Sequence, residues 1–115
     1  MRIIIAGSRG FANVKLMTEK LNKLFSVNKP TLIVSGGAKG ADQLGENYAR
    51  RMNIPVQQYL PQWKTFGISA GMKRNRLMAE NADALVAFWD GSSRGTAQMI
   101  EYANRMGLKV RVVLY

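Results

Sequence analysis

The 115-residue chain contains neither cysteine nor histidine. Without cysteine it can form neither a disulfide framework nor a thiolate metal site. Without histidine it lacks the commonest general base and the usual zinc ligand, so hydrolysis by a Ser-His or Cys-His pair is excluded. Its 7 Asp and Glu residues are the remaining candidates for acid–base chemistry. No metal site is predicted.

Acidic residues are also few beside 17 lysines and arginines, which leaves a formal net charge of +10. The isoelectric point is near 10.4. A surplus of this size attracts polyanions or phosphorylated small molecules. Because the basic residues are spread along the chain, a charge that serves solubility alone is an equally good interpretation at this point.

Long apolar runs are missing as well. No run approaches the roughly 20 residues needed to cross a bilayer, and the opening MRIII is too short for the core of a signal peptide. We therefore expect a cytoplasmic protein with no membrane partner. The length suits one domain with a real core, so a single domain over residues 1–115 is predicted.

Apolar, β-branched runs alternate with helical patterns along the chain. Strands are expected at residues 2–6, 31–35, 54–60, 82–89 and 108–115. Helices are expected after Asn13, from near Gly40, after Ser69 and from about Thr96 to Met106. This alternation predicts a three-layer α/β, Rossmann-like domain with a five-stranded parallel sheet in the order 3-2-1-4-5. The segment 61–71 is expected to be irregular. Its Trp63 and Phe66 would plug the core or contact a second subunit, with base stacking as the alternative.

Three small-residue loops follow the first, second and fourth predicted strands: GSRG at 7–10, GGAKG at 36–40 and DGSSRGT at 90–96. In a parallel sheet these loops share one edge, and helices that start there present amides and partial positive charge to an anion. One such loop could equally be a tight turn. Three on one edge favour a phosphate site. The candidate ligand-binding residues are Gly7, Ser8, Arg9, Ser35, Gly36, Gly37, Ala38, Lys39, Gly40, Asp42, Arg74, Asn75, Asp90, Gly91, Ser92, Ser93, Gly95 and Thr96.

Charged residues in and near these loops sharpen the hypothesis. Lys39 stands at a helix N-terminus, an unfavourable place for a cation unless an anion offsets it, and Arg9 is either a phosphate ligand or a solvated loop residue. No Ser or Thr follows Lys39, so the loop is not a Walker A motif. Helical spacing directs Arg74 toward the sheet, with Asp90 as its expected partner. Asp42 would bind loop amides or a ribose hydroxyl, or would merely favour the helix start.

The segments AGSRG, SGGAKGADQLGE, GMKRNRLMAENADALVAFWDG and SSRGT, in this order, resemble the SLOG superfamily. The resemblance is to its small YspA/YpsA-related branch, found in bacteria and phages. It implies a Rossmann-like fold that binds nucleotides, nucleotide-derived signals such as ADP-ribose derivatives, or nucleic acid.

Two related families suggest different activities. Residues 7–9, 35–40 and 74–76 are similar to the DNA-processing protein A family, which implies binding of single-stranded DNA. Residues from Arg74 to Thr96 also resemble the LOG phosphoribohydrolases, which split a base from a ribose phosphate. That chemistry needs a glutamate soon after the Gly-Thr pair, where this chain has Gln98 and Met99. Glu101 comes two residues later, about half a turn around the helix.

We therefore expect a protein that binds a nucleotide or an ADP-ribose-like ligand, requires no cofactor and is not an enzyme. The alternatives are a single-stranded nucleic-acid-binding module and an N-glycosidic hydrolase. The weak catalytic candidates for the hydrolase are Asp90 and Glu101, together with Asp42. Pairing of two copies through Trp63 and Phe66 is a further expectation.

Overall fold

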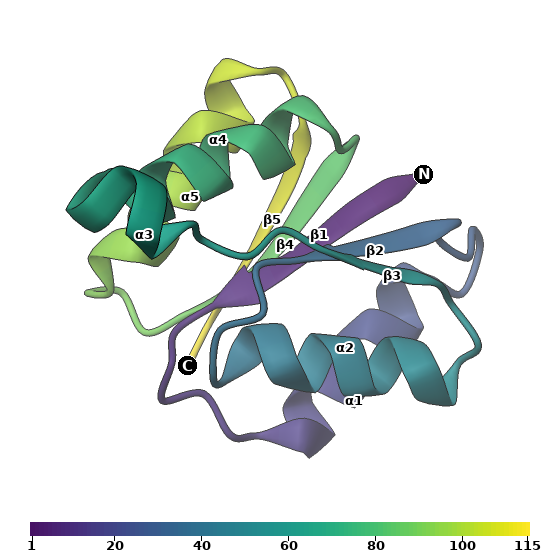
Figure 1. Cartoon of the computed structure of the whole chain (residues 1–115). Coiled ribbons are helices and arrows are strands. Elements are labelled where there is room, and N and C mark those ends of the chain that lie inside the picture. Colours follow the sequence, from purple (N-terminus) through teal and green to yellow (C-terminus); the bar gives the residue numbers. More distant parts are fainter.

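The computed structural model describes all 115 residues and shows one five-stranded parallel sheet between two layers of helices (Figure 1). The strand order β3-β2-β1-β4-β5 confirms the predicted topology. The strands are β1 (Arg2–Gly7), β2 (Leu32–Ser35), β3 (Val56–Gln58), β4 (Ala84–Trp89) and β5 (Lys109–Leu114). The helices are α1 (Val14–Leu24), α2 (Ala41–Arg51), α3 (Trp63–Phe66), α4 (Ala70–Glu80), α5 (Arg94–Arg105) and a 3-10 turn η1 (Gly67–Ser69).

Each face of the sheet has its own apolar core, because successive side chains of a strand point to opposite faces. Ile3 and Ile5 of β1 pack with residues of α1 and α2 on one face. Ile4 and Ala6 pack with residues of α4 and α5 on the other. The helices change sides between β3 and β4, so β1 and β4 flank the point where the winding reverses (Figure 1).

The strand register brings the predicted loops to one edge of the sheet. Gly7 at the end of β1 lies beside Phe88 of β4, and Ser35 ends β2 beside Gln58 of β3. The loops after β1, β2 and β4 therefore start side by side at the carboxyl edge. Figure 1 shows α3 at this same edge.

The prediction that the segment 61–71 is irregular is wrong. This segment holds α3, η1 and the start of α4. Trp63 and Phe66 do not plug the core, since both remain substantially exposed. Ser69 does not cap α4 with its side chain, because its hydroxyl donates to the carbonyl of Phe66. Four residues are too few to show helical periodicity, which explains why the sequence gives no sign of α3.

Asn13 caps α1, with its side-chain oxygen accepting from the amide of Leu16 at 3.0 Å. Among the helices, none combines the length and the apolar character that crossing a membrane would require.

Candidate functional site

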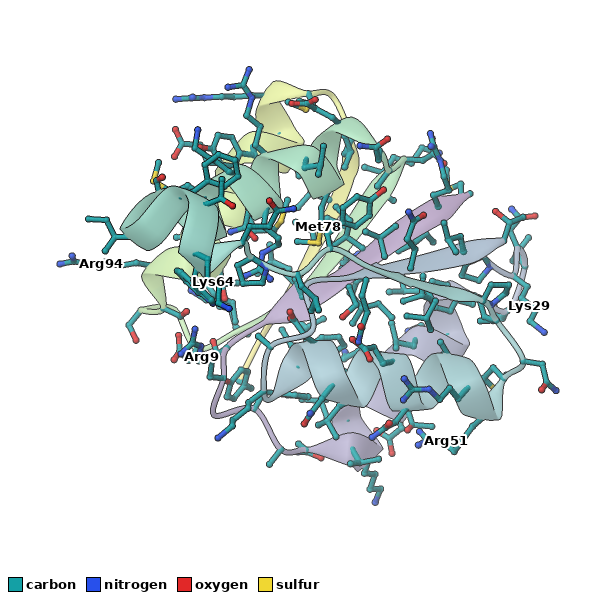
Figure 2. The ribbon with its side chains drawn as sticks, viewed as in Figure 1. Arg9, Lys29, Arg51, Lys64, Met78 and Arg94 are labelled. Carbon is teal, nitrogen blue, oxygen red and sulfur yellow. The ribbon has the colours of Figure 1, made fainter.

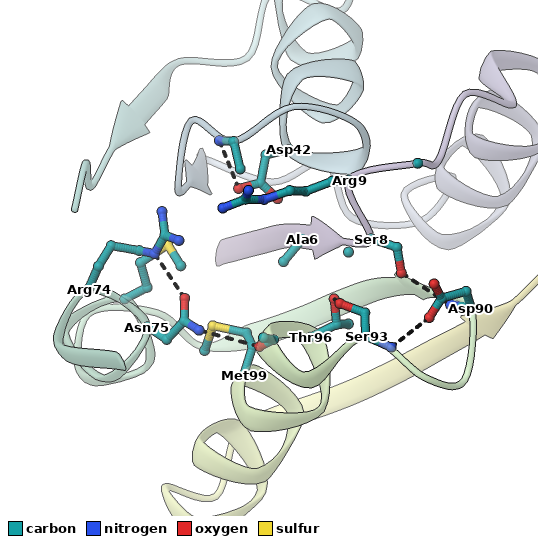
Figure 3. A pocket seen from close by; sticks show the side chains of 15 residues that line it. Ala6, Ser8, Arg9, Asp42, Arg74, Asn75, Asp90, Ser93, Thr96 and Met99 are labelled. Atoms are coloured by element: carbon teal, nitrogen blue, oxygen red, sulfur yellow. Dashed lines mark hydrogen bonds between the residues drawn. The ribbon is translucent and has the colours of Figure 1, made fainter. Parts of the chain in front are cut away.

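A cavity of about 440 Å³, here called the first hollow, opens at the carboxyl edge beside β1 and β4 (Figure 3). Its volume falls in the range of small-molecule sites. It is lined by Ala6, Gly7, Ser8, Arg9, Gly10, Ala38, Asp42, Arg74, Asn75, Met78, Asp90, Ser93, Gly95, Thr96 and Met99.

Polar side chains in the wall of the first hollow are held firmly by the fold. Ser8, Asp42, Asn75 and Thr96 are all buried. Ser8 Oγ accepts from the amide of Asp90 at 3.2 Å, and Asn75 Nδ2 donates to the carbonyl of Gly95 at 3.4 Å. These bonds tie the end of β1 to the β4–α5 loop and the middle of α4 to the first turn of α5, so the hollow is preorganised.

Arg74 crosses from α4 to the glycine loop after β2. Its Nη1 donates to the carbonyl of Gly36 at 2.6 Å, and its Nε donates to Asn75 Oδ1 at 2.9 Å. A Cβ at Gly36 would overlap the guanidinium, so this close approach requires glycine there. The predicted pairing of Arg74 with Asp90 is wrong. Arg74 lies on the β2 side of the hollow, where it binds Gly36, and Asp90 accepts from amides at the start of α5.

Asp90 fixes the N-terminus of α5. Its Oδ1 accepts from the amides of Ser92 at 2.9 Å and Ser93 at 2.8 Å. These amide hydrogen bonds hold the pKa of Asp90 below its usual range. Neither Ser93 nor Thr96 caps the helix with its hydroxyl. Their two hydroxyls lie 3.3 Å apart instead.

Asp42 stands in the first turn of α2 and is only 5% exposed. Its Oδ2 accepts from the amide of Ala38 at 3.2 Å, which confirms the predicted bond to a loop amide. Burial raises the pKa of Asp42 to about 6, although the Ala38 amide and the Arg74 guanidinium act in the opposite direction. Burial also lowers the pKa of Arg74, which Asp42 opposes and the charge of Arg9 reinforces.

A second cavity of about 460 Å³, here called the second hollow, adjoins the first. Arg9, Ala38 and Arg74 belong to both walls. The second hollow is lined by Arg9, Gly36, Gly37, Ala38, Lys39, Leu60, Pro61, Trp63 and Arg74. Arg9, Lys39 and Arg74, which the sequence placed in separate loops and helices, therefore surround one continuous recess.

None of these three cations has an ion-pair partner. The four ion pairs of the molecule join Arg2 to Asp83, Arg50 to Glu46, Arg76 to Glu80 and Arg105 to Glu101. These pairs use four of the seven carboxylates, whereas Asp42 and Asp90 line the first hollow. Arg9 and Lys39 are exposed at the recess. Figure 2 shows Arg9 and Lys64 at the same end of the sheet, with Lys29 at the opposite end.

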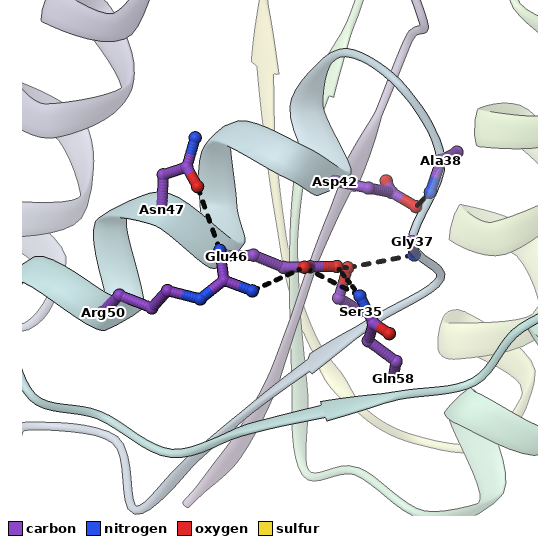
Figure 4. A network of polar contacts seen from close by, with 8 residues as sticks. All are labelled: Ser35, Gly37, Ala38, Asp42, Glu46, Asn47, Arg50 and Gln58. Carbon is purple, nitrogen blue, oxygen red and sulfur yellow. Dashed lines mark hydrogen bonds and ion pairs between the residues drawn. The ribbon is translucent and has the colours of Figure 1, made fainter.

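Behind the glycine loop lies a buried polar network centred on Glu46 of α2 (Figure 4). Glu46 accepts from Ser35 Oγ at 2.7 Å and from Gln58 Nε2 at 2.8 Å. Ser35 Oγ in turn accepts from the amide of Gly37 at 3.2 Å. Ser35 therefore supports the loop from behind and does not line either hollow.

Some predicted site residues lie outside both linings: Ser35, Gly40, Gly91, Ser92 and Glu101. Glu101 is exposed on α5 and pairs with Arg105. Sequence reasoning missed Ala6, Gly10, Met78 and Met99 in the first hollow, and Leu60 and Pro61 in the second. Met99 follows Thr96 by three residues, so helical spacing was the available signal for placing it on the same face.

Comparisons with known proteins place these observations in a family. The model of the family described as YspA, cpYpsA-related SLOG matches residues 1–66. The Gene 61 protein of Mycobacterium phage D29 is 29% identical over 116 residues, covering 95% of this chain and 93% of that protein.

Among solved structures, DNA processing protein A (DprA) from Streptococcus pneumoniae superposes with a TM-score of 0.76 at 19% identity. The match covers 97% of this chain and 49% of that one, so this chain spans about half the length of DprA. The likeness shows the Rossmann-like fold. With the family model matching more than half of the sequence, the chain belongs to the YspA, cpYpsA-related SLOG family.

Proposed function

We propose that this protein binds a nucleotide or a nucleotide-derived ligand in the first hollow. One observation carries the proposal: Arg9, Lys39 and Arg74 gather at a single recess and none of them forms an ion pair, although Asp42 and Asp90 also line it. Three cations in so small a space repel one another, and a phosphate would relieve that repulsion. The charges therefore favour an anionic ligand over an apolar one.

The chemistry of the lining suggests how such a ligand would lie. Its phosphate would sit between Arg9 and Arg74, near the glycine loop. A ribose hydroxyl could donate to Asp42, whose carboxylate faces the first hollow. The apolar side chains of Met78 and Met99 offer a surface to the rest of the nucleoside.

Isothermal titration with AMP tests this proposal. Wild-type protein should bind AMP, and Arg74→Ala should weaken binding by about tenfold or more, because a hydrogen bond to a charged group contributes about 1.5–3 kcal/mol. Arg76→Ala is the matched control, since Arg76 lies two residues away on α4 and pairs with Glu80. Absence of heat, or equal losses for both variants, would contradict the proposal.

A second candidate is binding of single-stranded nucleic acid, favoured by the net charge of +10 and by the continuity of the two hollows. Backbone-dominated binding falls steeply with salt. Fluorescence anisotropy with a single-stranded oligonucleotide at 50 and 200 mM salt tests this candidate. For a few phosphate contacts, the affinity should fall by about one to two orders of magnitude between these two salt concentrations. Salt-insensitive or absent binding removes it.

Hydrolysis of an N-glycosidic bond at the same hollow would depend on Asp42. Its pKa of about 6 suits acid–base chemistry near neutral pH. Asp90 is poorly placed for this role because its carboxylate already accepts two amides, and Glu101 lies away from the hollow. Release of free base from nucleoside monophosphates, lost in Asp42→Asn, is the observation that would support it.

A further inference from the structure

We infer that the second hollow is a subsite for the second nucleoside of a ligand in which two nucleosides are joined through phosphate. The inference rests on the proposed function and specifies its ligand class. A mononucleotide would occupy the first hollow alone. A dinucleotide would cross the shared wall of Arg9, Ala38 and Arg74 and place its second base against Trp63.

The shared wall is where a linking phosphate would be needed. Arg9 and Arg74 line both hollows, so an anion between them would have one nucleoside on each side. Arg74 is oriented by its bonds to Gly36 and Asn75, which leaves little freedom for it to turn away. The hollows have similar volumes, about 440 and 460 Å³, and each is in the range of a small-molecule site.

The far wall of the second hollow has the character of a base-stacking surface. Trp63 is 54% exposed and Leu60 is 59% exposed, although both are large apolar side chains. Core packing does not require either of them. Trp63 leans on the first turn of α4, where a Cβ at Gly71 would lie 3.8 Å from its Cη2. The indole is therefore supported along one side and open on another.

Cations and this aromatic ring line the same recess. Lys39 and Arg9 border the second hollow together with Trp63, and Lys64 follows Trp63 in α3. Aromatic side chains that stack bases beside cations that neutralise phosphates are the common means of holding nucleotides without sequence readout. An acidic peptide would use the cations and leave Trp63 and Leu60 uncovered, so the nucleotide fits both properties.

Titrating the full chain with AMP, ADP and the 5′-phosphorylated dinucleotide pApA tests the inference. Because one stacked base strengthens binding substantially, we expect pApA to bind about tenfold or more tightly than ADP, which matches it in phosphate number. Trp63→Ala should remove that gain and leave the AMP affinity unchanged, and Trp63→Phe should keep most of it. Titration with a ten-nucleotide strand distinguishes the two sources of such a ligand. Tighter binding of the strand than of pApA indicates a nucleic-acid strand, and equal affinity indicates a free dinucleotide.

Equal affinities for ADP and pApA, or a Trp63→Ala variant that binds pApA like wild type, would overturn the subsite while leaving nucleotide binding intact. The subsite would also be overturned if Trp63→Ala converted a dimer to a monomer without changing either affinity. Absence of binding to all three ligands would overturn the proposed function and the subsite together.

Discussion

At the scale of single residues, Asp42 is a buried carboxyl whose pKa the fold raises. Burial raises its pKa to about 6 from 3.8. Between these values the folded state holds a proton that the unfolded state has released. The free energy of unfolding therefore falls as the pH rises from about 4 to about 6, and the deficit persists above that range.

Asp42→Asn should remove this deficit. At pH 7.5 we expect the variant to be more stable by about 1–3 kcal/mol, since a shift of one pKa unit corresponds to about 1.4 kcal/mol. The amide oxygen can still accept from Ala38. The advantage should vanish near pH 4, where both states of the wild type hold the proton. Urea denaturation at several pH values measures it.

Asp83→Asn serves as the control of opposite sign. The amide of Arg2 donates to Asp83 Oδ2 at 2.7 Å and holds the pKa of this carboxyl below its usual range. Its contribution to stability is present above the unfolded pKa and is lost as the pH falls. Asp83→Asn should thus destabilise the protein at pH 7.5. A pH-independent effect of Asp42→Asn would contradict the account.

At the scale of elements, the Glu46 network joins α2, β2 and β3 behind the glycine loop. Glu46→Gln places an amide group among the donors of Ser35, Gln58 and Arg50. A buried mismatch of this kind costs about 1–3 kcal/mol, and we expect the free energy of unfolding to fall by that amount.

The matched control is Glu101→Gln on α5, which removes an exposed ion pair with Arg105. Exposed pairs contribute at most about 1 kcal/mol, so this variant should stay close to wild type. Chemical denaturation of both variants at one pH provides the comparison. If the two substitutions had the same small effect, the network would not be what holds the loop.

Elements built from local patterns could be predicted from the sequence. The apolar runs and glycine loops indicated the five strands, their order and the shared edge, because strand burial and turn chemistry are local properties. The Glu46 network could not be predicted, since Ser35, Glu46 and Gln58 meet only after β3 pairs with β2. The one sign of this network in the sequence was the position of Glu46, which lies four residues after Asp42 and therefore on the same face of α2.

Helix faces were the weakest part of the prediction. Arg74 was correctly directed inward, yet its partner is the Gly36 carbonyl and not Asp90. Sequence spacing fixes the face of a helix but not which strand that face approaches. Trp63 was assigned to the core or a subunit contact, with base stacking as the alternative. Its place beside the second hollow depends on a four-residue helix with no detectable period.

At the scale of the whole molecule, the fold collects charge at one edge of the sheet. Four of the seven carboxylates pair with arginines elsewhere, and Asp90 is bound to α5 amides. The recess is left with three cations, Asp90 and the buried Asp42. Phosphates should be drawn to the place where the loops after β1 and β2 meet, because Arg9, Lys39 and Arg74 lie together there.

The most direct test of this account is an NMR titration of the ¹⁵N-labelled protein with AMP. The account predicts that the largest shifts of backbone amides fall on residues 7–10, 36–40 and 92–96, and that Arg74→Ala reduces them at equal ligand concentration. Shifts spread evenly over the basic surface, or confined to the opposite edge of the sheet near Lys29, would contradict it.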